Sequence, residues 1–230
     1  MKVSIILPTF NEADNIIELV EKIIINIPSG WDYEIIVVDD NSPDGTYEKV
    51  KTFFQKNDSV FSILRTLDKG FAKSIRAGIE NATGESVIVM DTDFTHDPVE
   101  IPKLLHVGKI YDIVSGSRFC PGGNMQDFKH YIFSFVFNLF LRLSIRTQIQ
   151  DNLGGYFIAK TDKLRGLPYD KIFYGYGDYF FRLLHYAQQE GMTIVEIPAK
   201  YIGRNKGHSK SNYLKMFFSY TKEIVRLNFK

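Results

Sequence analysis

The chain has 230 residues, of which 44% are hydrophobic and 24% charged, and this composition excludes an intrinsically disordered protein. The formal net charge of +1 gives no reason to expect a nucleic-acid partner. A single cysteine, Cys120, excludes an internal disulfide and is typical of a reducing compartment, so we expect a cytoplasmic protein. No stretch approaches the ~20 continuous apolar residues of a membrane-spanning helix.

The first half of the chain alternates short apolar runs with helical patterns. Apolar runs that end at turn residues predict buried strands at 3–7, 34–38, 60–65 and 86–90. Apolar residues at helical spacing predict helices at 16–27, 46–56 and 71–82. This alternation predicts an α/β fold with a doubly wound, mainly parallel sheet.

The second half of the chain has a less regular pattern. We expect strands at 111–115 and 194–197, and helices at 129–146, 178–190 and around 211–228. No repeat or low-complexity linker divides the sequence. We therefore expect a single domain over residues 1–230.

Polar segments follow three of the predicted strands. They are PTFNE (8–12), DDNSPDG (39–45) and DTDFTH (91–96). Ligands of open parallel sheets bind at the carboxyl ends of the strands. We therefore expect these three segments to lie side by side at one site.

Asp91 and Asp93 come directly after the predicted strand 86–90. Residues two apart in an extended segment point the same way, so both carboxylates can face one hard cation such as Mg²⁺ or Mn²⁺. Such a cation neutralises the charge of a diphosphate leaving group. The spacing agrees equally well with solvated loop acids, or with a helix N-cap before Pro98.

Asp39 and Asp40 follow the predicted strand 34–38. An acid at this position can accept a hydrogen bond from a ribose hydroxyl or a base. Asp, Asn, Ser, Pro and Gly in this order also form a turn without any ligand. On the residues alone, the turn is the stronger interpretation.

Basic residues fall in two loops that we place near the strand ends. They are Arg118, Arg204, Lys206 and Lys210. The arginine fork matches a phosphate group, and lysine supplies a point charge. A lone basic residue is usually a solvated surface charge, but a cluster beside two carboxylates indicates anion binding. No dinucleotide fingerprint and no P-loop sequence occurs, which disfavours a dehydrogenase or a P-loop NTPase.

Six segments in order resemble the family 2 glycosyltransferases, and within them the dolichol/polyprenol phosphate mannose synthase group. The segments are SIILPTFNE (4–12), EIIVVDDNSPDGT (34–46), KGFAKSIRAGI (69–79), GESVIVMDTDFTHDP (84–98), DIVSGSR (112–118) and IVEIPAKYIGRNKGHSK (194–210). The resemblance implies a GT-A fold with a Rossmann-like nucleotide-binding half. It also implies a metal-dependent glycosyltransferase that inverts configuration at the sugar.

The resemblance assigns roles to individual positions. The implied nucleotide pocket consists of Pro8, Phe10, Glu12, Val37 and Asp39. The implied metal and catalytic group consists of Asp91, Thr92, Asp93, Thr95 and Arg118, with Asp91, Asp93 and Thr95 as metal ligands. The implied phosphate contacts, to donor diphosphate or acceptor phosphate, are Arg118, Arg204 and Lys210.

The chain departs from the group's pattern at a few positions. Phe10 replaces the usual tyrosine, and Thr95 stands where a glutamine commonly helps to hold the metal. The segment 151–160 lacks the usual Ser-Gly-Phe sequence, and Arg182 stands where a glutamate is expected. These departures leave the sugar and the acceptor open.

The resemblance implies transfer of a hexose from a nucleotide diphosphate sugar to a polyprenyl or dolichyl phosphate. Mannose from GDP-mannose is favoured, with UDP-glucose as the alternative donor. A phosphate acceptor is already anionic and needs no general base, whereas a saccharide or glycolipid hydroxyl would need one, such as Asp151 or Asp178. A non-catalytic nucleotide-sugar-binding subunit is the second alternative.

Two predicted helices indicate attachment to a membrane surface. The helix 129–146 has one narrow polar stripe and more apolar surface than the ~100° needed to face a core, although a helix buried on most sides has the same pattern. The helix 211–228 is basic, aromatic and amphipathic, as interfacial helices are, although a helix packed on the domain could also be. We expect a peripheral protein at the cytoplasmic face of a membrane, with a membrane-spanning partner subunit as the alternative.

Overall fold

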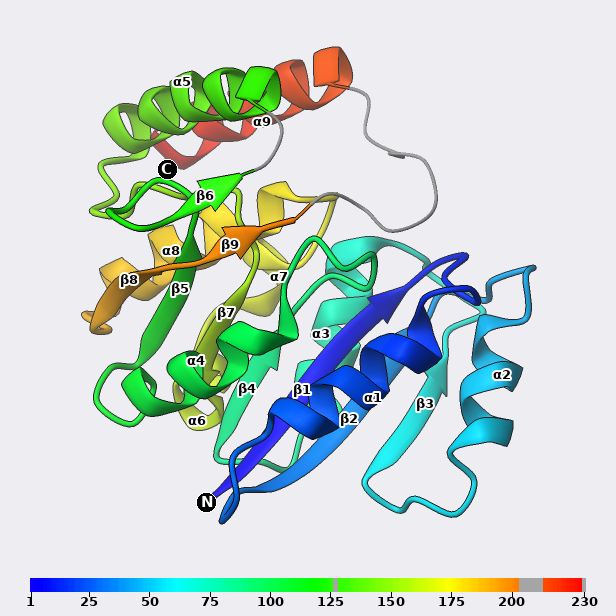
Figure 1. The fold of residues 1–230 in the computed structure, drawn as a ribbon. Coiled ribbons are helices and arrows are strands. Elements are labelled where there is room, and N and C mark those ends of the chain that lie inside the picture. The colour runs from blue at the N-terminus through cyan, green and yellow to red at the C-terminus, as the bar shows by residue number, and fades with distance from the viewer. Residues whose placement is uncertain (126–127, 203–212, 229–230) are drawn as a thin grey trace.

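The computed structural model describes residues 1–125, 128–202 and 213–228. A seven-stranded sheet with the order β3-β2-β1-β4-β7-β5-β8 forms its centre (Figure 1). The strands are β1 (Lys2–Thr9), β2 (Asp32–Asp39), β3 (Val60–Leu64), β4 (Ser86–Val89), β5 (Ile113–Ser117), β7 (Phe157–Lys160) and β8 (Ile194–Pro198). Only β7 is antiparallel to its neighbours, which are β4 and β5. The predicted mainly parallel, doubly wound sheet is confirmed.

Helices cover both faces of the sheet, which explains why its central strands are apolar throughout. One face carries α1 (Ile16–Asn26), α2 (Thr46–Phe53), a 3₁₀ turn at Pro98–Glu100 and α4 (Ile101–Val107). The other face carries α3 (Phe71–Asn81), α6 (Thr161–Arg165), α7 (Tyr169–Ile172) and α8 (Asp178–Gln189). Alternate residues of β1 enter the two cores, with Ile5 on the α1 side and Ile6 on the α3 side.

Helices α5 (Phe128–Ile145) and α9 (Tyr213–Asn228) pack against each other outside these two layers (Figure 1). They share a small core with α8, built on Phe137, Leu141, Phe181, Tyr220 and Ile224. The short strands β6 (Asn124–Met125) and β9 (Lys200–Tyr201) pair beside them. The single-domain organisation stays a prediction.

The outer side of α5 is apolar and exposed, so the interpretation of this helix as buried on most sides is wrong. Seven large apolar side chains of α5 are between 42% and 72% exposed. They are Ile132, Phe133, Phe135, Val136, Leu139, Phe140 and Leu143. None of the helices in the described part of the chain combines the length and the apolar character needed to cross a bilayer.

Glu34 ties the first two strands together at the edge of the sheet opposite to their carboxyl ends. It is 5% exposed and accepts hydrogen bonds from the Ser4 hydroxyl at 2.5 Å and the Thr83 N–H at 2.6 Å. The Lys2 ammonium lies 2.8 Å from its Oε2. Burial raises the pKa of Glu34, but the bonds from Lys2, Ser4 and Thr83 outweigh it and lower the pKa from 4.5 to about 2.

This shift predicts a pH dependence of folding. Because the pKa of Glu34 is lower in the folded state, its contribution is complete above about pH 4.5 and is lost as the pH falls towards 2. The difference between the free energies of unfolding of the wild type and Glu34→Gln should therefore shrink as the pH falls from about 4.5 towards 2. Denaturant titrations of both proteins across this range check the expectation, and a constant gap would contradict it.

Candidate active site

A pocket of about 360 Å³ opens at the carboxyl ends of β1 and β4. All three polar segments expected at one site contribute to its lining. The residues of those segments that line it are Pro8, Thr9, Phe10, Glu12, Asp40, Asp91, Thr92 and Asp93. The pocket joins residues more than 80 positions apart because parallel strands end at the same edge.

The two acids sit on a tight turn rather than on an extended segment. Asp93 is 5% exposed, and its Oδ1 accepts from the Thr95 N–H at 3.0 Å and the Thr95 hydroxyl at 2.6 Å. Phe94, which lies between Asp93 and Thr95, has a φ of 67°, and this region of backbone conformation disfavours a bulky side chain. Its ring is buried in the core on the α1 side, so packing holds the turn in this conformation.

His96 is hydrogen-bonded to the first residue of this turn. Its Nδ1 accepts a hydrogen bond from the Asp91 N–H at 2.8 Å, and its Nε2 lies 3.1 Å from the Gly154 carbonyl oxygen. The ring stacks on Tyr156 with centroids 4.8 Å apart. Burial lowers the pKa of His96 to about 4, so the ring is neutral at pH 7 with its proton on Nε2. His96 therefore orients the backbone of Asp91.

The donor set of the pocket fits a hard divalent cation. Mg²⁺ binds proteins through one or two carboxylates and takes its other ligands from substrate phosphates and water. Asp91 and Asp93 provide two carboxylates on one pocket wall. No cluster of three or more His, Cys, Asp or Glu side chains suited to a metal occurs in the described residues, so ligand oxygens would complete the coordination. Thr95, the third expected ligand, donates its hydroxyl to Asp93 and is not part of the pocket lining.

Two residues assigned to the nucleotide pocket do not line it. Val37 is fully buried in the core, and the Asp39 carboxylate is 0% exposed. Asp39 accepts from Thr9 Oγ1 at 3.0 Å and from the Ser42 N–H at 2.8 Å, so it shapes the turn after β2. Neither residue is among those lining the pocket in the described chain. Asp40 lines it instead.

Several other residues of the pocket wall have no role in the expectations drawn from the sequence. They are Lys69, Gly70, Phe71, Ser74 and Tyr176. The first four belong to the segment KGFAKSIRAGI, which carried the family resemblance and was therefore a usable signal. Asp40 fixes this segment, because its Oδ2 accepts from the Gly70 N–H at 2.7 Å and its Oδ1 from Ser74 Oγ at 2.8 Å.

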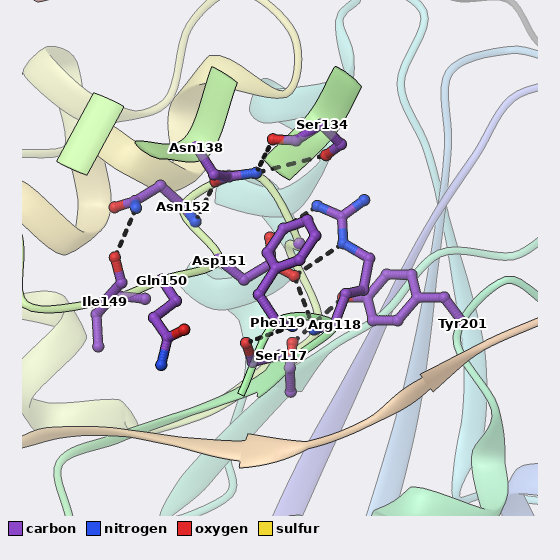
Figure 2. A network of polar contacts seen from close by, with 12 residues as sticks. Ser117, Arg118, Phe119, Ser134, Asn138, Ile149, Gln150, Asp151, Asn152 and Tyr201 are labelled. Atoms are coloured by element: carbon purple, nitrogen blue, oxygen red, sulfur yellow. Dashed lines mark hydrogen bonds and ion pairs between the residues drawn. The ribbon is translucent and has the colours of Figure 1, made fainter. Parts of the chain in front are cut away.

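Arg118 follows β5 and pairs with Asp151 (Figure 2). Its Nε lies 2.8 Å from Oδ2 and its Nη2 2.7 Å from Oδ1, while its own N–H donates to Oδ2 at 3.0 Å. Burial opposes the charge of Arg118, but the Asp151 carboxylate outweighs this and raises the pKa of the guanidinium. The expected phosphate contact thus has its charge balanced by Asp151, and Arg118 is not among the residues lining the pocket in the described chain. The other expected phosphate contacts, Arg204 and Lys210, lie outside the described residues.

The Asp151 segment is itself held from several elements. The Gln150 and Asp151 N–H groups donate to the Glu196 carboxylate, each at 2.8 Å. Asn138 of α5, 1% exposed, accepts from the Asn152 N–H at 2.7 Å (Figure 2). The segment therefore connects α5 and β8 to Arg118.

Comparison with known proteins assigns the family. The profile described as Glycosyl transferase family 2 matches residues 4–167. The chain belongs to this family. It is similar to a dolichol-phosphate mannosyltransferase of Pyrococcus furiosus, with 35% identity over 99% of this chain and 64% of that protein. The chain thus spans less than two thirds of the length of this relative.

Other relatives match over most of their length. An undecaprenyl-phosphate mannosyltransferase of Micrococcus luteus is 33% identical over 91% of this chain and 87% of its own. The glucosyl-3-phosphoglycerate synthase of Mycobacterium tuberculosis, solved with Mn²⁺, UDP-glucose and phosphoglyceric acid, superposes with a TM-score of 0.69 at 17% identity. The match covers 98% of this chain and 78% of that one. The predicted GT-A fold is confirmed.

Proposed function

We propose that this family 2 glycosyltransferase is a metal-dependent, inverting enzyme that moves mannose from GDP-mannose to a polyprenyl phosphate. The observation that carries the proposal is that Asp91 and Asp93 line one pocket together with Phe10 and Glu12. The two mannosyltransferase relatives, whose names specify dolichol phosphate and undecaprenyl phosphate, support the sugar and the acceptor class.

In this proposal four residues of the pocket act directly on the donor. Asp91 and Asp93 would hold a divalent cation, which would supply positive charge for the leaving nucleoside diphosphate. Phe10, 44% exposed at the pocket, offers a ring face for the base, and Glu12 offers a hydrogen-bond acceptor. His96 accepts a hydrogen bond from the Asp91 N–H, and the Thr95 hydroxyl donates to the Asp93 carboxylate. These two contacts hold the acids in place.

The hydrogen bonds and ion pairs of Asp151 and Asp178 favour a phosphate acceptor over a hydroxyl. A hydroxyl acceptor needs a general base within reach of its proton. Asp151 is 0% exposed and accepts three hydrogen bonds from Arg118. Asp178 is 3% exposed and pairs with Arg182. Neither of the two acids expected to act as a base for a hydroxyl acceptor is therefore suited to take a proton.

Binding of a nucleotide-sugar panel tests the donor. GDP-mannose, UDP-glucose and their nucleoside diphosphates should be titrated by calorimetry with and without Mn²⁺. We expect GDP-mannose to bind in the presence of Mn²⁺ and to weaken markedly in EDTA. Binding that ignores the metal would contradict the role of the acid pair. Binding without turnover on any acceptor would favour the non-catalytic subunit.

We also propose that the protein attaches peripherally to the cytoplasmic face of a membrane through α5 and α9. The exposed apolar side of α5 adjoins α9, where Phe218 is 71% and Val225 52% exposed. Basic residues accompany these apolar groups, with Arg142 on α5 and Lys222 on α9 both exposed. Interfacial helices combine these two features. A membrane-spanning partner subunit is the alternative.

Vesicle binding tests this attachment. Each basic residue near an anionic surface contributes about 1 kcal/mol, so Arg142→Gln with Lys222→Gln should weaken binding to anionic vesicles by about tenfold or more. Binding to neutral vesicles should change little. Lys163→Gln, an exposed lysine on α6 far from α5 in Figure 1, is the matched control. Wild-type protein that does not float with anionic vesicles would leave only attachment through a partner.

A further inference from the structure

A fully buried arginine lies behind the pocket, at the position where the family resemblance leads one to expect a glutamate. Arg182 of α8 is 0% exposed. Its Nε donates to the Ile172 carbonyl at 3.0 Å, its Nη2 to the Tyr174 carbonyl, and its Nη1 to Asp178 Oδ2 at 2.5 Å. A buried guanidinium requires such partners, and these three hydrogen-bond acceptors all belong to residues 172–178. Arg182 therefore fixes the backbone of this segment.

Helix α9 completes the same cluster. Glu223 is 8% exposed, lies 3.7 Å from Arg182 Nη1, and accepts the hydrogen bond of the Tyr174 hydroxyl. The Arg182 guanidinium also lies 3.7 Å from the centroid of the Tyr174 ring. A carboxylate of α9 therefore shares the charge of Arg182 with Asp178 and holds the side chain of Tyr174.

A close approach of α9 to the same segment reinforces this contact. Tyr220 of α9 is 2% exposed, and a Cβ placed on Gly177 would come within 2.8 Å of its hydroxyl oxygen. A side chain at 177 would displace the Tyr220 hydroxyl. Helix and segment are therefore fitted to each other.

The other side of this segment forms a wall of the pocket. Tyr176 lines the pocket, and its ring centroid is 5.2 Å from that of Phe71 on the facing wall of α3. Its N–H donates to Asp178 Oδ1 at 2.7 Å. The Asp178 carboxylate thus uses one oxygen for the pocket wall and the other for Arg182.

We propose that Arg182 and Glu223 are positioning residues for the pocket, and that the docking of α9 is thereby linked to nucleoside diphosphate binding. They hold residues 174–178 so that Tyr176 stands at the correct depth in the wall. The inference rests on the proposed function for the identity of the ligand alone. Linkage is reciprocal, so nucleotide binding should in turn strengthen the docking of α9.

Two mild variants test the proposal. Glu223→Gln keeps the shape of the side chain and removes its charge, and Tyr174→Phe removes the hydroxyl while keeping the ring near Arg182. Each should lower the affinity for GDP with Mn²⁺ by about fivefold or more, within the usual range of coupling between sites. Each should also speed amide hydrogen exchange in residues 172–178. In the wild type, GDP with Mn²⁺ should slow exchange in α9.

Glu34→Gln is the matched control, because Glu34 is also a buried, ion-paired carboxylate but lies at the opposite edge of the sheet. It should destabilise the fold and leave GDP affinity unchanged. An equal affinity loss in Glu34→Gln, or unchanged affinity and exchange in both test variants, would overturn the inference. If the wild type binds neither GDP nor UDP with Mn²⁺, the proposed donor fails, and hydrogen exchange in residues 172–178 decides the positioning role alone.

Discussion

Asp91→Asn and Asp93→Asn are each expected to lower turnover by on the order of 10²–10³-fold, the usual cost of removing one group that stabilises developing charge. The double variant should cost little more than either single one, because residues that share one ion act as a unit. Folding should survive, since an asparagine oxygen at 93 can still accept from Thr95, as Asp93 does at 2.6 Å. Steady-state kinetics with a saturating divalent cation measure the loss.

The control for this experiment is an acid with no place in the pocket. Asp162→Asn changes an exposed acid of α6 and should leave turnover unchanged. Thermal unfolding of the wild type and the four variants separates lost chemistry from lost stability. Wild-type activity that persists in excess EDTA would contradict the assignment of Asp91 and Asp93 to a metal.

Arg118→Met is expected to lower the free energy of unfolding by about 3–5 kcal/mol, the usual cost of breaking a buried ion pair from one side. Arg118 is 8% and Asp151 0% exposed, so the variant leaves a carboxylate buried without its counter-charge. Asp151→Asn should also destabilise the fold, because it leaves the guanidinium without a charged partner. Urea titrations of the single variants and of the double variant give the coupling energy between the two residues.

An exposed pair in the same chain provides the comparison. Arg76 is 35% and Glu80 47% exposed across their 2.8 Å contact, and such surface pairs contribute about 0–1 kcal/mol. Arg76→Met should therefore cost far less than Arg118→Met. Equal costs for the two variants would show that the Arg118–Asp151 pair is not the support that we describe.

Sequence patterns predicted the strand–helix alternation well where the signal is local. The run from Lys2 to Thr9 and the helix Ile16–Asn26 have clear periodicity, because each packs against one continuous core. The strand at Phe157–Lys160 was missed. It is four residues long and antiparallel, and its position depends on pairing with β4 and β5, about 70 and 45 residues earlier in the chain. The short helix Ile101–Val107 was missed as well, since seven residues hold too few turns for a pattern.

The candidate site was predictable to a similar degree. The position of Asp91 and Asp93 after a strand placed both in the pocket. The strand pattern points to Asp39 and Asp40 together, and the resemblance selects Asp39, whereas Asp40 is the one that lines the pocket. The partner of Arg118 is Asp151, 33 residues away, and no spacing rule connects them. Tyr176 could not be predicted, since only the folded chain brings it to the acid pair.

Transfer of labelled mannose tests the central claim most directly. The protein should be incubated with GDP-mannose, Mn²⁺ and a polyprenyl phosphate in anionic vesicles, with a saccharide acceptor in a parallel reaction. We expect a labelled lipid that forms only with the metal present, is lost in Asp91→Asn, and has the anomeric configuration opposite to that of the donor. Label that appears on the saccharide hydroxyl and never on the polyprenyl phosphate would contradict the proposed acceptor.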